Sequence, residues 1–157
     1  MTDRIATAKN AFVDLIGHAN EAEGATRISG RIMGILIFEG RAMSFGELAT
    51  ALGVSRGSIS TNTRSLVARG IITRRNIDGE RQDYFEVSDT HSVTMLRDIS
   101  ARLAATATKI SQIAQTLPRD AAPQQTRLQR FADFHMTVSD AILTASTDVA
   151  AQKGEDP

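Results

Sequence analysis

The sequence predicts a mainly α-helical protein with one small β-hairpin and a pair of long helices at its C-terminal end. Three observations predict this fold class. Apolar residues recur at spacings of three and four along most of the chain. Two strand-like runs flank the dipeptide Asp78-Gly79. The last third of the chain carries two sustained heptad patterns. A chain of 157 residues is long enough to bury one such core.

Two helices are expected before residue 40. The apolar spacing predicts the first over residues 3–20 and the second over residues 27–38, where Gly40 ends it. Gly30 and Gly34 lie four residues apart in the second helix, which indicates close packing against another helix. The first helix is expected to bury one side formed by Ile5, Ala8, Phe12, Leu15, Ile16 and Ala19.

A pair of short capped helices follows. Ser44 and Glu47 have the spacing of a capping box, in which each side chain satisfies a free amide of the first turn. Gly53 then supplies the C-terminal stop. Ser55 can cap a second helix that ends at Gly70. Two short helices joined by a tight turn predict a helix-turn-helix.

The hairpin completes the pattern. The runs "IITRRNI" and "ERQDYFEV" are rich in strand-forming residues, and Asp78-Gly79 between them favours a tight reversal with positive φ. The order helix, turn, helix and charged hairpin describes a winged helix-turn-helix.

The second short helix has a small, polar outer face. When Ile59 and Leu66 are placed on the buried side, a rotation of 100° per residue directs Thr61 and Arg64 away from the core. Gly57 and Ala68 share that direction, with Ser58, Ser60 and Ser65 beside them and Asn62 and Thr63 near the buried edge. Small residues, hydroxyls and a guanidinium are the groups that suit a helix in the DNA major groove.

Positive charge is concentrated in this region. Six arginines and two acidic residues lie between Arg56 and Arg81, although the whole chain has no net charge. Such a patch indicates a specific nucleic-acid surface. Arg81, beside the turn, could enter a minor groove, whereas Arg75 could equally pair with Asp83 or Glu86. The predicted DNA-binding residues are Ser55, Arg56, Gly57, Ser58, Ser60, Thr61, Asn62, Arg64, Ser65, Arg74, Arg75 and Arg81.

The segment 91–152 is expected to form two helices with apolar seams, joined by a linker between Pro118 and Pro123. Such helices can form an antiparallel hairpin or can pair with a second chain. The tail, residues 153–157, is expected to be disordered. The seam residues predicted for dimerisation are Leu96, Ile99, Leu103, Ile110, Ile113, Leu117, Leu128, Phe131, Val138 and Ile142.

Several function classes are disfavoured. The chain has no cysteine, no metal-ligand spacing, no Gly-rich phosphate loop and no nucleophile with a neighbouring base, so we expect neither an enzyme nor a metal or cofactor. No secretory signal is visible, and the longest apolar run is too short to cross a bilayer, which predicts a cytoplasmic protein without a membrane partner. The alternative to DNA binding is a winged helix used as a protein-interaction or oligomerisation module. The outward Arg64 and its hydroxyl neighbours argue against this alternative, because protein interfaces favour large anchors.

Three stretches, "GRIMGIL", "SFGELATALGVSRGSISTNTRSLVARGII" and "GERQDYFEV", resemble the MarR superfamily of winged-helix transcriptional regulators, and within it the GbsR-like branch. The matching positions are Gly30, Arg31, Ile32 and Gly34, then Ser55, Gly57, Ser58, Ser60, Asn62, Arg64 and Leu66, and finally Gly79, Glu80, Arg81 and Tyr84. Phe85 stands where this branch often has a second Tyr, and Thr63 where it has an aliphatic residue.

The resemblance implies a transcriptional regulator, with repression as the commoner outcome, that binds a pseudo-palindrome in double-stranded DNA as a homodimer. Residues 25–90 would form the winged DNA-binding domain. The N-terminal helix, residues 1–24, and the helices of residues 91–152 would form the dimer interface. A small-molecule effector is a further partner that the resemblance implies, in the crevice between the winged domain and the dimerisation helices.

Overall fold

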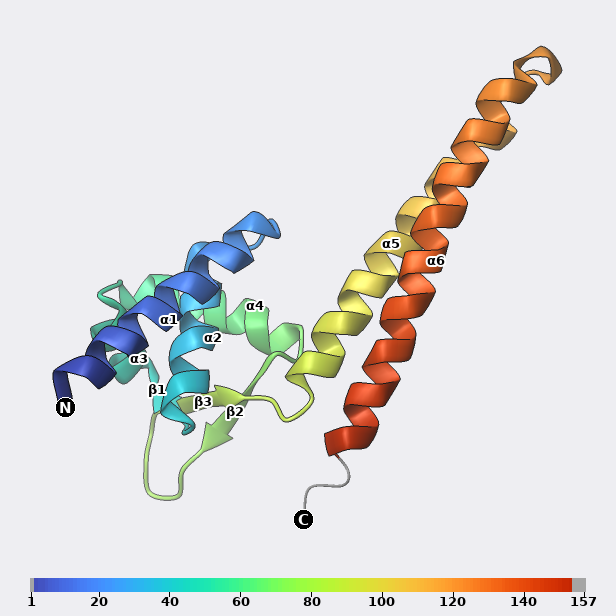
Figure 1. Ribbon diagram of the computed structural model, residues 1–157. Helices are drawn as coiled ribbons and strands as arrows, with labels where there is room; N and C mark the ends of the chain where they lie inside the picture. The colour runs from blue at the N-terminus through green and yellow to red at the C-terminus, as the bar shows by residue number, and fades with distance from the viewer. Residues whose placement is uncertain (1, 154–157) are drawn as a thin grey trace. The chain divides into compact units, whose positions relative to one another are not determined.

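The computed structural model describes residues 2–153, which divide into two compact units on either side of the boundary between His91 and Ser92. The first unit contains four helices and a small sheet, and the second is a helical hairpin (Figure 1). The mainly helical fold with a small β-sheet is therefore confirmed. The elements in chain order are α1 Thr2–Ala22, α2 Arg27–Glu39, β1 Met43–Ser44, α3 Phe45–Leu52, α4 Arg56–Ala68, β2 Ile72–Asn76, β3 Asp83–Val87, α5 His91–Gln115, the 3₁₀ turn η1 Arg119–Ala121 and α6 Ala122–Lys153. The predicted disordered tail lies outside the described residues from 154 onward.

Helices α1 and α2 pack closely through glycines. A Cβ atom built on Gly30 would lie 2.6 Å from the carbonyl oxygen of Ile16, and one on Gly34 would lie 3.1 Å from the Cα of Val13. The prediction of close helix packing at this glycine pair is confirmed. The prediction for the inner face of α1 is wrong at four of its six residues, because Ile5, Ala8, Leu15 and Ala19 are exposed. The glycine groove of α2 receives Val13 and Ile16 instead, and this contact sets the rotation of α1.

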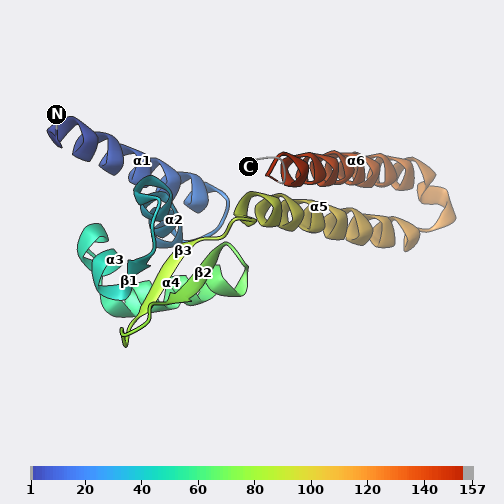
Figure 2. The same ribbon diagram turned by 90° about the horizontal axis from the view of Figure 1, so that it is seen from below.

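The sheet has the antiparallel order β1-β3-β2, seen from below in Figure 2. The hairpin of β2 and β3 is confirmed, but its turn is longer than predicted. Asn76 pairs with Asp83, so residues 77–82 form the loop, and Gly79 has the expected positive φ of 86°. The register that buries Phe85 in the core fixes this pairing. Strand β1 was not predicted, because two residues carry no alternating pattern.

Both capped helices of the helix-turn-helix are present. Ser44 Oγ accepts a hydrogen bond from the amide of Glu47 at 3.3 Å, and Glu47 Oε2 accepts one from the amide of Ser44 at 2.8 Å. Gly53 ends α3 in the left-handed conformation with φ 64°. The hydrogen bond from the Ser44 amide, helped by Arg41, lowers the pKa of Glu47 below its usual value of 4.5.

We expect the stability that Glu47 contributes to depend on pH. A carboxylate with a lowered folded-state pKa stabilises the fold above its unfolded pKa, and loses this effect as the pH falls through the folded value. Wild type should therefore exceed Glu47→Gln in unfolding free energy at pH 7, and the difference should shrink below about pH 4.5. Urea unfolding between pH 7 and 3, with Glu23→Gln as the surface control, measures this. A difference that stays constant with pH would contradict the prediction.

The second unit is an antiparallel hairpin of α5 and α6. Its two helices pack through small side chains, and at the centre Ser139 Oγ lies 2.9 Å from Ser100 Oγ and donates to the Ser100 carbonyl at 2.9 Å. The helices therefore pair within the chain, one of the two arrangements that the heptads allowed. The buried residues recur every seven positions and are Val93, Ser100, Ala107 and Ala114 on α5, and Ala132, Ser139 and Ser146 on α6.

The face that packs within the hairpin is rotated by one residue from the predicted seams at four positions, and the dimerisation role of the seam residues stays a prediction. The structure buries positions 100, 114, 132 and 139 in place of the larger Ile99, Ile113, Phe131 and Val138. Alanine and serine allow the helix backbones to approach closely, whereas an aromatic ring in the same place would separate them. The remaining predicted seam residues, which are half-buried, belong to this hairpin; they are Leu96, Leu103, Ile110, Leu117, Leu128 and Ile142.

Residues 2–153 contain neither a membrane-spanning helix nor a cluster of metal-binding side chains. No helix there is both long and apolar enough to cross a bilayer. Within the same residues, no three His, Cys, Asp or Glu side chains are grouped so that they could hold a metal ion.

Candidate nucleic-acid interface

Helix α4 is anchored at its start and along one side. Ser55 caps it by accepting a hydrogen bond from the amide of Ser58 at 3.2 Å. Ile59 and Leu66 are 0% and 1% exposed, so they form the buried stripe that the sequence predicts. The residues that the rotation directs outward are exposed in the structure, and they are Gly57, Thr61, Arg64 and Ala68. Beside them lie exposed Ser65 and half-buried Ser58 and Ser60.

The threonines of α4 are compatible with the helix because their hydroxyls bond to the preceding turn. Thr61 Oγ1 donates to the carbonyl of Gly57 at 3.1 Å, and buried Thr63 donates to that of Ile59 at 2.8 Å. The Thr61 oxygen keeps its acceptor capacity toward the outside. The outer face of α4 therefore carries mostly short side chains and is rich in hydroxyl groups.

Asn62 does not belong to this outer face, although the sequence analysis includes it among the DNA-binding residues. Its side chain is buried, and its amide nitrogen donates to the carbonyl of Ser58 at 2.8 Å. Its amide oxygen accepts a hydrogen bond from the hydroxyl of Thr26, the residue that caps α2. Asn62 therefore joins α4 to the start of α2. The role of Thr26 was not predicted, since no local pattern relates residues 36 positions apart.

Gly57 has no internal role that would explain it. A Cβ atom at this position would meet nothing nearer than Ser55 Oγ at 3.9 Å. The residue also lacks a positive φ, which distinguishes it from Gly53. Gly57 therefore leaves the backbone at the start of α4 open to solvent.

We expect Gly57→Ala to separate stability from DNA binding. The substitution should raise the free energy of unfolding by about 0.5–1 kcal/mol, because alanine loses less backbone freedom in a helix. It should weaken DNA binding if the backbone of α4 lies against the duplex. Thermal unfolding and fluorescence anisotropy measure the two effects. The matched control Gly30→Ala should instead destabilise the fold, because its Cβ would collide with α1; unchanged DNA affinity for Gly57→Ala would contradict the assignment.

The arginines of the wing divide into paired and unpaired ones. Arg74 Nη1 lies 3.5 Å from Asp83 Oδ2, and Arg75 forms an ion pair with Glu86. These two arginines are consecutive residues of β2, so they lie on opposite faces of the strand. Of the arginines between residues 56 and 81, three are exposed and form no ion pair with any residue that the structure describes, namely Arg56, Arg64 and Arg81. They stand at the start of α4, on its outer face and in the wing loop.

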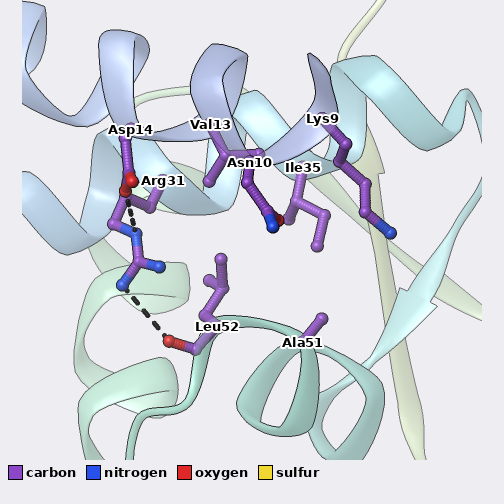
Figure 3. A pocket seen from close by; sticks show the side chains of 8 residues that line it. All are labelled: Lys9, Asn10, Val13, Asp14, Arg31, Ile35, Ala51 and Leu52. Carbon is purple, nitrogen blue, oxygen red and sulfur yellow. Dashed lines mark hydrogen bonds and ion pairs between the residues drawn. The ribbon is translucent and has the colours of Figure 1, made fainter. Parts of the chain in front are cut away.

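A pocket of about 270 Å³ lies between α1, α2 and α3 (Figure 3). Arg31 crosses it, with Nε 3.2 Å from Asp14 Oδ1 as an ion pair without hydrogen-bond geometry, and with Nη1 donating to the carbonyl of Leu52 at 3.2 Å. Lys9 at its rim pairs with Glu39 at 3.2 Å. The other residues that line the pocket are Asn10, Val13, Ile35 and Ala51. Both cationic side chains that line the pocket therefore have an acidic partner, Asp14 for Arg31 and Glu39 for Lys9.

The structure has the features of a winged-helix DNA-binding protein. These are a capped helix-turn-helix, a three-stranded sheet with a hairpin wing, and unpaired arginines on α4 and on the wing. The chain belongs to the MarR family: a model of that family matches residues 23–82. The chain is 31% identical to the HTH-type transcriptional regulator MmpR5 of Mycobacterium tuberculosis, over 92% of this chain and 88% of that protein.

Two further comparisons agree. The chain is 26% identical to the putative HTH-type transcriptional regulator YvaV of Bacillus subtilis, over 74% of this chain and 66% of that protein. A crystal structure described as that of a transcriptional regulator matches with a TM-score of 0.63 and 27% identity, over 90% of this chain and 99% of that chain. The protein is therefore a DNA-binding transcriptional regulator. This result favours DNA binding over the alternative of a protein-interaction module.

Proposed function

We propose that this regulator binds a pseudo-palindromic operator as a homodimer, represses transcription and belongs to the GbsR-like branch of its family. The observation that carries the proposal is the outer face of α4, where Gly57, Thr61 and unpaired Arg64 are exposed together. The protein acts by binding, without catalysing a reaction. The GbsR-like assignment is supported by the glycine pair of α2 and by the wing sequence from Gly79 to Tyr84.

In this proposal α4 lies in the major groove and the wing lies over the adjacent minor groove. The guanidinium of Arg64 would take O6 and N7 of a guanine together, while hydroxyls of α4 bind phosphates or base edges. Arg56 and the first amides of α4, after the Ser55 cap, would face a phosphate. Arg81 would enter the minor groove, where negative potential attracts cations. Two protomers would place their α4 helices about one helical turn of DNA apart.

Selection of bound fragments from the source genome at physiological salt tests the proposal. We expect recovery of a short sequence with two related half-sites, bound about 10³-fold or more tightly than random DNA of equal length. Placing this operator in front of a reporter gene then distinguishes repression from activation. Equal affinity for selected and random DNA would contradict an operator-specific role.

The dimer interface that we propose includes one side of the α5–α6 hairpin. Ile99 and Ile113 each come one residue before a buried position of α5, which places them at −100° from the packed face of that helix. Phe131 and Val138 are related in the same way to the buried positions of α6. Because the helices are antiparallel, equal rotations place both rows on the same side. Ile113 and Phe131 are 56% and 55% exposed and Ile99 and Val138 are half-buried, so this side presents uncovered apolar surface. Exposed Ile5 and Leu15 add apolar surface on α1.

Charged substitutions on this side of the hairpin should produce monomers. We expect the double variant Ile113→Glu and Phe131→Glu to sediment as a monomer at micromolar concentration, with unchanged helix content and weakened operator binding, because a buried charge in an apolar interface is costly. Analytical ultracentrifugation measures the mass. Leu143→Glu is the matched control, since Leu143 is an exposed leucine of α6 that lies off this side. A dimeric double variant would remove this side of the hairpin from the interface.

The pocket between α1, α2 and α3 is where we place an effector. It lies between a helix assigned to dimerisation and the winged domain, so an occupant could alter how the two are held together. A thermal-shift screen of a fragment library, with wild type and a variant in which Ala51→Phe fills the pocket, tests this. A compound that binds in this pocket should raise the unfolding midpoint of the wild-type protein and leave that of the Ala51→Phe variant unchanged.

A further inference from the structure

Three side chains of the wing form a closed set of hydrogen bonds. Tyr84 Oη donates to Glu80 Oε2 at 2.5 Å. The amide nitrogen of Gln82 donates to the same carboxylate oxygen at 3.0 Å and also lies 2.9 Å from Tyr84 Oη. Tyr84 is anchored in β3, opposite Arg75, so the cluster ties the loop to the sheet. These hydrogen bonds belong neither to the buried core nor to the outer face of α4.

Arg81 lies inside this loop but takes no part in the cluster. Glu80 and Gln82 both converge on Tyr84, and Arg81 stands between them in the sequence. Arg81 is exposed, and it forms no ion pair with any residue that the structure describes. The loop is also bounded by Gly79, with φ 86°, and by the Asn76–Asp83 pair of the sheet. The cluster therefore holds the loop residues on either side of Arg81 and leaves Arg81 itself exposed.

The cluster also determines what the Glu80 carboxylate binds. Glu80 is the sequence neighbour of Arg81 and would be a nearby ion-pair partner, but its carboxylate accepts from Tyr84 and Gln82 instead. The hydrogen bond from Tyr84 lowers the pKa of Glu80, and the same bond raises the pKa of Tyr84. At neutral pH Glu80 is thus ionised and Tyr84 is protonated, which are the states that this hydrogen bond requires.

We propose that Glu80, Gln82 and Tyr84 are positioning residues that keep Arg81 unpaired and directed outward for the minor groove. The inference rests on the proposed function of the wing. It names the residues that hold the loop around Arg81 in one conformation. The benefit is entropic: an arginine on a loop that is already ordered loses less freedom when it binds.

The experiment is a double-mutant cycle on operator affinity between Tyr84→Phe and Arg81→Ala, in the full-length protein. Tyr84→Phe removes one hydroxyl and keeps the ring. In the Arg81 background we expect it to weaken binding by about 3- to 10-fold, and in the Arg81→Ala background by less than about 1.5-fold, because the two residues act together. Tyr84→Phe should also flatten the dependence of affinity on salt, although it removes no charge, because Arg81 then neutralises its phosphates less well.

The outcomes are distinguishable. If Arg81→Ala leaves affinity unchanged, the proposed role of the wing fails, and the inference fails with it. If Arg81→Ala weakens binding but Tyr84→Phe does not, the inference alone is overturned. Equal losses from Tyr84→Phe in both backgrounds would show that the Tyr84 hydroxyl contacts DNA itself, which also overturns it. Gln82→Ala, at an exposed position, is a second probe that should reproduce the coupling to Arg81 without disturbing the core.

Discussion

Replacing Ile59 by alanine is expected to lower the free energy of unfolding by about 2–5 kcal/mol. Ile59 is completely buried, and with Leu66 it forms the apolar stripe by which α4 packs on the rest of the winged unit. The truncation removes apolar contacts and leaves a cavity that the surrounding helices can fill only in part. Because α4 is rich in Ser and Thr, its intrinsic helix propensity compensates little for this loss.

Two variants calibrate this measurement by urea unfolding at pH 7. Ile59→Val removes a single methylene group and should cost about 0.5–1.5 kcal/mol. Arg64→Ala changes an exposed residue of the same helix and should stay within about 0.5 kcal/mol of wild type. A cost below about 1 kcal/mol for Ile59→Ala would show that α4 is held chiefly by contacts other than its apolar stripe.

Arg64→Ala is expected to weaken operator binding by about 1–3 kcal/mol and to relax the preference at one base pair of each half-site. Arg64 is exposed on the outer face of α4, and it forms no ion pair with any residue the structure describes. Its guanidinium can therefore bind a guanine edge without first losing a partner in the chain. Fluorescence anisotropy with the operator and with variants at each base pair measures both effects.

Arg64→Lys separates the charge of this residue from its shape. Lysine keeps the positive charge but lacks the planar fork that binds O6 and N7 together, so we expect specificity to fall nearly as far as in Arg64→Ala. Arg119→Ala, an exposed arginine in the turn of the second unit, is the control and should leave the base preference unchanged. Unaltered base preference in Arg64→Ala would remove Arg64 from the base-contacting residues.

The features that short-range chemistry controls were predicted correctly. The Ser44–Glu47 capping box, the Ser55 cap and the positive φ of Gly53 each depend on a few neighbouring residues. The exposed face of α4 followed from the 100° helical rotation once its buried stripe was recognised. These rules hold because a helix imposes the same geometry wherever it lies, so the order of side chains around it can be read from their spacing.

The features that depend on distant residues were not predicted. Thr26 and Asn62 meet across 36 positions, and the two-residue strand β1 exists because β3 lies beside it. The rotation of the α5–α6 seam by one residue depends on how closely two backbones can approach, which the heptad spacing does not specify. The convergence of Glu80 and Gln82 on the Tyr84 hydroxyl also depends on how the loop folds back on the sheet.

For this protein, the spacing of caps, glycines and apolar residues is sufficient to predict a winged helix-turn-helix and the outer face of α4, because those properties are local and periodic. Tertiary contacts determine which polar groups have a partner within the chain. They place Asn62 inside the fold, pair Arg74 and Arg75 within the wing, and leave Arg64 and Arg81 without an ion pair in the described chain. The physical reason is that a hydrogen bond or an ion pair depends on distances of about 3 Å between atoms, and only packing brings distant residues that close.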